Sequence, residues 1–160
     1  MKYLKLIKLL YLADREALSR WSRPITTDNY VSMDNGPVLS QVLKRIDDGA
    51  APGEPTFWTS HIVPCGDWDV ILTADPSDGQ LSKAEERVLD KIFEQFGHRN
   101  RWDIVKFVHT LPEWQDPSGS AIPIDYRDIL KALKKPDEEI AAIEAELAEL
   151  NQVESFMIAS

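Results

Sequence analysis

The chain opens with the sequence MKYLKLIKLLYLADREALS, residues 1–19, which is built almost entirely from good helix formers. Apolar side chains occupy so many of its positions that a helix over this segment has little room for a polar face. We therefore expect a largely buried helix at the centre of a core. This helix also starts without a capping residue or a preceding segment, which is unusual for a central element.

Short elements are expected to follow this helix. Pro24 ends the first helical region because proline lacks an amide hydrogen, and residues 30–33 read as a short extended piece. Gly36 and Pro37 predict a turn that leads into a second helix, with Pro37 at its first position and its end near Ile46. Residues 48–55 hold two glycines and two prolines and predict a loop.

A β-hairpin is expected next, followed by more helices. The β-prone runs 57–63 and 68–73 are separated by a short loop with a glycine, which is the spacing of a hairpin. Ser82 and Glu85 form a capping-box pattern that opens a helix ending at Gly97. The remaining capping patterns predict helices over 101–110 and 126–133 and a last one from Pro136.

These elements predict an α+β fold that is mainly α, with about five to six helices and one small β-hairpin. At 160 residues the chain fits one compact domain. We assign residues 1–135 to that domain and residues 136–160 to an acidic amphipathic C-terminal helix, packed on the domain or on a partner. The single cysteine, Cys65, and the lysines that interrupt the first apolar segment favour the cytoplasm, with no membrane span.

Charge is distributed unevenly along the chain. The net charge is −9, yet residues 1–47 carry eight Lys/Arg against five Asp/Glu, so the acidity belongs to the remainder. An acidic surface repels phosphate backbones, which disfavours direct binding of nucleic acid. A basic protein partner suits it better.

The last helix combines an apolar stripe with an acidic face. The stripe, formed by Ile140, Ile143, Leu147 and Leu150, follows alternating spacings of three and four residues, and no Lys or Arg follows Lys135. It is too short to establish a coiled coil, so docking on its own domain is favoured over docking on another chain. The acidic face is either a solvated surface or a contact for a basic partner.

The residue patterns of enzymes and metal sites are weak in this sequence. The histidines and Cys65 lack zinc-ligand spacing, and no phosphate-binding loop or serine-hydrolase elbow occurs, so we expect neither metal nor cofactor. Asp14 and Glu16 point to different faces of their helix, which disfavours an acid–base pair. Asp14 more plausibly ties down a backbone turn or pairs with an arginine such as Arg23. We expect His109 to lie at the end of a helix, where an imidazole complements the helix dipole. Trp114 is the tryptophan that we expect to be partly exposed and to contact a partner.

Four segments together resemble the Panacea family, also known as SocA-like antitoxins. They are Lys8-Leu9-Leu10-Tyr11-Leu12-Ala13-Asp14-Arg15, Arg23-Pro24-Ile25-Thr26, Gly36-Pro37-Val38-Leu39-Ser40 and Pro112-Glu113-Trp114. The resemblance covers about residues 4–133. It implies a helical domain with a small β element, encoded beside a toxin, which binds and inactivates that toxin without catalysis.

Other functions stay open under this resemblance. One is an adaptor that delivers a toxin to an AAA+ protease. Another is a phage- or mobile-element-associated protein with enzyme activity on a small molecule. A homodimer is also left open. The resemblance implies that Tyr11 and Asp14 face the Gly36-Pro37 turn and border a shared groove with Trp114. The candidate partner-binding residues are Tyr11, Asp14, Arg15, Gly36, Pro37, His109 and Trp114, to which the C-terminal stripe is added.

The resemblance also implies a helix ahead of Lys8 that this sequence lacks. Leu4, Leu6 and Leu10 are therefore expected to be short of a covering layer. Either the start lies upstream of Met1 or another chain supplies the cover.

Overall fold

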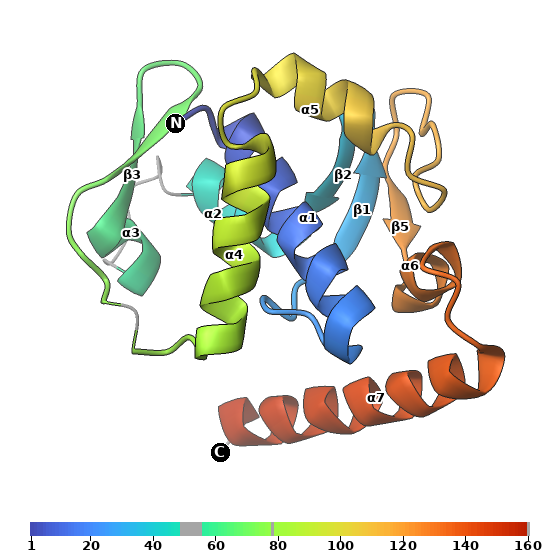
Figure 1. The fold of residues 1–160 in the computed structure, drawn as a ribbon. Helices are drawn as coiled ribbons and strands as arrows, with labels where there is room; N and C mark the ends of the chain where they lie inside the picture. The colour runs from blue at the N-terminus through green and yellow to red at the C-terminus, as the bar shows by residue number, and fades with distance from the viewer. Residues whose placement is uncertain (49–55, 78, 160) are drawn as a thin grey trace.

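The fold is built around the first helix, which the computed structural model places at the centre of the molecule (Figure 1). The structure describes residues 1–48, 56–77 and 79–159. Helix α1 (Tyr3–Trp21) is buried along much of its length and packs against α4, α5, α6 and the strand β2. The expected central helix is therefore confirmed. The helices of the described residues are α1 (Tyr3–Trp21), α2 (Ser40–Asp48), α3 (Phe57–His61), α4 (Lys83–Phe96), α5 (Arg101–Val108), α6 (Tyr126–Ala132) and α7 (Asp137–Ala159).

Two small antiparallel sheets accompany these helices. Strands β1 (Tyr30–Met33), β2 (Gly36–Leu39) and β5 (Ile122–Ile124) form one sheet in the order β2-β1-β5. Strands β3 (Ile62–Cys65) and β4 (Asp69–Leu72) form the other. The prediction of an α+β, mainly α fold is confirmed, and the structure adds the three-stranded sheet to the expected hairpin.

The segment after Gly36 was assigned to a helix too early. Residues 36–39 pair with β1 as an edge strand, with Pro37 opposite Ser32, and the helix begins only at Ser40. An edge strand tolerates a proline because one side of it needs no amide donors. Helix α2 receives its cap from Asp28, whose carboxylate accepts from the backbone N–H groups of Gln41 at 2.9 Å and Val42 at 3.0 Å.

The hairpin is present, but its first strand is shorter than predicted. Residues 57–61 form the short helix α3, and the strand begins at Ile62. The reason is local, because Thr56 and Thr59 cap each other's backbone N–H groups and favour a helical turn over the β propensity of the segment. The predicted loop over 48–55 lies, apart from Asp48, outside the described residues.

The start of α1 is held by the hairpin. No side chain caps it, but the N–H of Tyr3 donates to the carbonyl of Trp68 at 2.9 Å, and Val70 donates to the carbonyl of Met1 at 2.8 Å. The leucines expected to lack cover are half-buried: Leu6 packs against a small cluster around Ile7, and Leu10 against the main core. None of the described helices is long and apolar enough to cross a membrane.

Candidate partner-binding site

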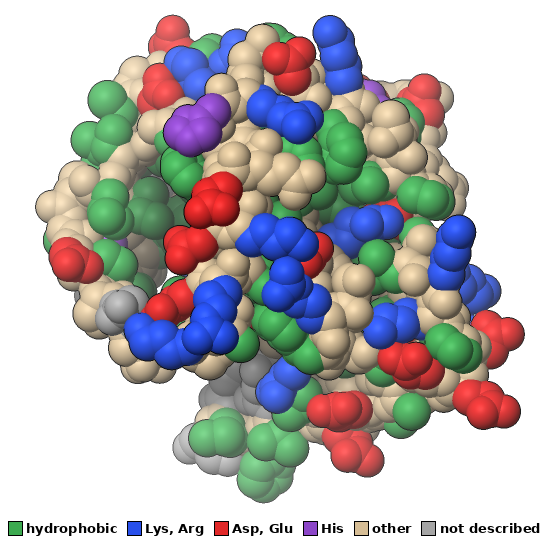
Figure 2. Space-filling view, in the orientation of Figure 1, with side chains coloured by type: hydrophobic (Ala, Val, Ile, Leu, Met, Phe, Trp, Pro, Cys, Tyr) green, Lys and Arg blue, Asp and Glu red, His purple; other side chains and the backbone are tan. Residues whose placement is uncertain are grey.

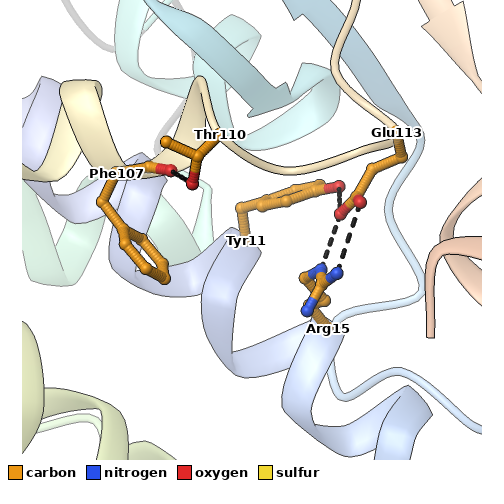
Figure 3. Close-up of polar contacts among 5 residues, drawn as sticks. All are labelled: Tyr11, Arg15, Phe107, Thr110 and Glu113. Atoms are coloured by element: carbon orange, nitrogen blue, oxygen red, sulfur yellow. Dashed lines mark hydrogen bonds and ion pairs between the residues drawn. The ribbon is translucent and has the colours of Figure 1, made fainter.

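A buried carboxylate joins α1 to the segment after α5 (Figure 3). Tyr11 and Arg15 lie four residues apart on one face of α1 and both point to Glu113. The Tyr11 hydroxyl donates to Glu113 Oε1 at 2.9 Å, and Arg15 Nε donates to the same oxygen at 2.6 Å. Burial, and then the Glu113 carboxylate, raise the pKa of the Tyr11 phenol. Through these contacts, Glu113 holds the segment after α5 against α1.

Asp14 organises the turn that follows α1. Its carboxylate accepts from the backbone N–H groups of Ile25 at 2.9 Å and Thr26 at 3.0 Å, from the Thr26 hydroxyl, and from the Tyr30 hydroxyl at 2.7 Å. Burial raises the pKa of Asp14, and the hydrogen bonds from Thr26 and Tyr30 act against that rise. Of the two roles weighed for Asp14, the structure supports the backbone turn, and its partners do not include Arg23.

Gly36 allows the β1–β2 hairpin to approach α5 closely. Its φ is +96°, a conformation that favours glycine, and a Cβ there would lie 2.6 Å from Val108 Cγ2. Beside it, the fully buried Lys8 donates from Nζ to the carbonyl of Pro37 at 2.7 Å. Burial lowers the pKa of Lys8 to about 7. Gly36 and Pro37, at the start of β2, are therefore part of the packing between α1 and α5.

His109 and Trp114 form a stacked pair at the edge of this region. Their ring centroids lie 4.1 Å apart with the planes inclined by 19°. Trp114 Nε1 donates to the carbonyl of Met33 at 3.1 Å, which ties the pair to the hairpin. His109 Nε2 is buried and has no hydrogen-bond partner among the described residues. As whole residues, His109 and Trp114 are half-buried, so part of each remains accessible.

The candidate residues are therefore brought together, but most of them do not face solvent. Tyr11 and Asp14 have no exposed surface, and Gly36 and Pro37 are buried. The candidates that keep some exposed surface are Arg15, whose side chain is 20% exposed, and the pair of His109 and Trp114. Direct partner binding at these residues stays a prediction. Glu113 and Lys8 contribute buried contacts to this cluster, and neither was assigned a role from sequence. For Glu113, its place in the Pro112-Glu113-Trp114 segment was the available signal.

The C-terminal stripe divides into two halves. Ile140, Ile143 and Leu147 are at most 8% exposed and belong to the main core, and Leu150 is half-buried. Past Leu150, the side chains of Val153, Phe156 and Met157 are exposed. Figure 2 shows acidic side chains along α7 and hydrophobic ones gathered near its C-terminal end.

A second exposed apolar surface lies at the opposite end of the fold, where sequence patterns did not indicate one. It is a hollow of about 530 Å³ between the start of α1 and the α4–α5 connection. Three half-exposed apolar side chains line it, together with basic ones that include Arg99 and Arg101. The apolar side chains are those of Met1, Phe93 and Trp102. Because they are distant in sequence, no local pattern marks them as neighbours.

Comparison with known proteins supplies one match. The model of a family described as antitoxin SocA-like, Panacea domain, matches residues 6–115. No curated protein and no solved structure matched the chain. The matched range contains all of the polar cluster around Glu113 and Asp14, and it leaves α6 and α7 outside.

Proposed function

The chain belongs to the Panacea-domain family of SocA-like antitoxins, and from this premise we propose that it neutralises a cognate toxin by direct, stoichiometric binding. The family match carries the proposal because it covers most of the chain, from α1 through Trp114. Neutralisation by binding needs a stable framework and an accessible surface, and it needs no reacting group.

The polar residues of the matched segments support this reading. Lys8, Asp14 and Glu113 are buried, and each is engaged with another part of the chain. Their contacts join α1 to the β1–β2 hairpin and to the segment after α5. We infer that these residues maintain the shape of the domain, while exposed side chains elsewhere contact the toxin.

The charge of the chain favours a basic toxin. The net charge is −9, and from Pro136 to Ala159 the sequence has seven acidic residues and no Lys or Arg. Complementary charges accelerate encounter between proteins and disfavour partners of the same sign. The toxin surface that meets α7 is therefore expected to carry lysine or arginine.

Co-expression with the product of the adjacent reading frame tests the proposal. That product alone should arrest growth, and this chain should restore growth while forming a complex of fixed stoichiometry. The toxin concentration should remain unchanged, since delivery to an AAA+ protease would instead shorten its half-life. Rescue by amounts of this chain far below those of the toxin, or rescue without a complex, would contradict binding as the mechanism.

A further inference from the structure

The distal half of α7 carries apolar side chains that are largely exposed in the described structure. Val153 is 57% exposed, Phe156 is 76% exposed and Met157 is 72% exposed. Leu147, which precedes Val153 by about two turns, is only 8% exposed. Exposed apolar groups that gather on one element mark interaction sites more often than scattered ones do. We call Leu150, Val153 and Met157 the distal patch.

The distal patch has the spacing of a helix that docks in a groove. Leu150, Val153 and Met157 follow one another at intervals of three and four residues, so they share one face of α7. Glu146 and Glu149 precede Leu150 and Val153 by four residues each and are exposed. Carboxylates therefore lie on the face that carries the apolar anchors.

This arrangement favours a basic partner over symmetric pairing with the α7 helix of a second copy. Pairing two α7 helices through the distal patch would bring acidic residues of one copy against acidic residues of the other, because α7 contains no Lys or Arg. Like charges across an interface are unfavourable. An apolar groove with basic residues at its rim is complementary to both features of the patch.

We propose that the distal patch is the segment of this chain that docks in a basic-rimmed apolar groove of the toxin. This inference rests on the proposed function and adds the binding surface and the chemistry of the partner. Helix α7 lies outside the residues that the family model matches. In this proposal the matched domain is the framework, and α7 supplies a contact from outside the matched range.

Two double variants test the distal patch against a matched control. V153D with M157D places two carboxylates in the patch. N151D with S155D adds the same charge to the exposed opposite face of the same turns. We expect the first variant to bind the toxin at least about 100-fold more weakly than the parent chain, since buried apolar anchors contribute most of the affinity at an interface. The control should bind within about threefold of the parent.

A second pair of variants tests the charge of the partner. E146Q with E149Q removes two carboxylates beside the patch, and D137N with E138Q removes two from the start of the helix. The first pair should weaken binding at low salt and reduce its salt dependence, whereas the second should change binding little. Equal effects of the two pairs would overturn the assignment of a basic rim to this face.

The possible outcomes separate the inference from the proposed function. If the parent chain protects cells and V153D with M157D protects them equally, with circular dichroism showing a folded protein, the distal patch is not the docking surface. If light scattering shows a dimer of the parent chain that this variant abolishes, a second copy covers the patch and the inference is wrong. If the parent chain neither binds nor protects, the proposed function itself fails.

Discussion

Lys8 is an ionisable side chain placed where water does not reach it. It is fully buried in α1, its ammonium donates to the carbonyl of Pro37, and burial lowers its pKa to about 7 from an ordinary value of 10.5. Between these two values the unfolded chain holds the proton on Lys8 and the folded chain releases it. The unfolded state therefore binds more protons, and the contribution of Lys8 to stability rises with pH in this window.

Urea unfolding of the parent chain and of K8M at pH 7, 8 and 9 measures this contribution. The free energy of unfolding of the parent should increase relative to K8M by up to about 1.4 kcal/mol for each pH unit. The difference between the two proteins cancels the titration of all groups that they share. A difference that stays constant from pH 7 to 9 would show that Lys8 titrates normally in the folded protein.

The sequence predicted the role of a single residue where its side chain binds backbone groups of a segment that follows soon after it in the chain. Asp14 was expected either to tie down a turn or to pair with an arginine such as Arg23. It accepts hydrogen bonds from the N–H groups of Ile25 and Thr26, eleven and twelve residues away, as the first alternative predicted. Glu113 was missed as a structural residue because its partners lie about a hundred residues away on α1. A carboxylate beside a proline and a tryptophan has no local feature that indicates burial.

At the scale of elements, α7 is one helix with two environments. Its first half contributes Ile143, 5% exposed, to the main core, and its second half carries Val153 in solvent. We expect I143A to lower the free energy of unfolding by about 2–4 kcal/mol, because it leaves a cavity in packed surroundings. V153A should change stability by less than about 0.5 kcal/mol.

Denaturant unfolding of both variants checks this contrast. Similar losses for I143A and V153A would mean that the two halves of α7 are equally packed in solution. A small loss for V153A also supports using substitutions in the distal patch as probes of binding, since they leave the fold intact.

The strand β2 shows how tertiary pairing overrides a local signal. Gly36 followed by Pro37 is a common start of a helix, and the helix is present, but it begins at Ser40. Pairing with β1 and the cap that Asp28 supplies from another loop set this boundary. Neither interaction can be read from residues 36–40 alone.

For the whole molecule, the uneven charge predicts how association depends on salt. Residues 1–47 are net positive, while the rest of the chain is strongly acidic and ends in a helix without basic residues. Long-range attraction between an acidic and a basic protein acts mainly on the association rate and is screened within about 8 Å at physiological ionic strength.

Stopped-flow association with the toxin should show this effect. The association rate constant is expected to fall by at least about tenfold between low and high salt, with a much smaller change in the dissociation rate. A rate that does not respond to salt, or that increases with it, would contradict a basic partner. The same measurement on N151D with S155D, which adds two charges outside the patch, should show a slightly faster association at low salt.

The amino-acid sequence by itself determined the features that depend on near neighbours. The buried first helix follows from its apolar content, the start of α4 from the capping box of Ser82 and Glu85, and the β3–β4 hairpin from two β-prone runs around a short loop. Each depends on contacts within about one or two turns of chain. Local propensity and hydrogen bonding describe such contacts well.

Only the tertiary structure decided which distant segments meet. It paired β1 with β5, brought Glu113 to Tyr11, and covered the first half of the α7 stripe while leaving Val153 exposed. These choices depend on the closure of long loops and on the packing of the whole core, where many combinations are locally equivalent. The physical reason is that an apolar sequence can indicate that a segment is buried, whereas the segments that cover it are set by the packing of the whole molecule.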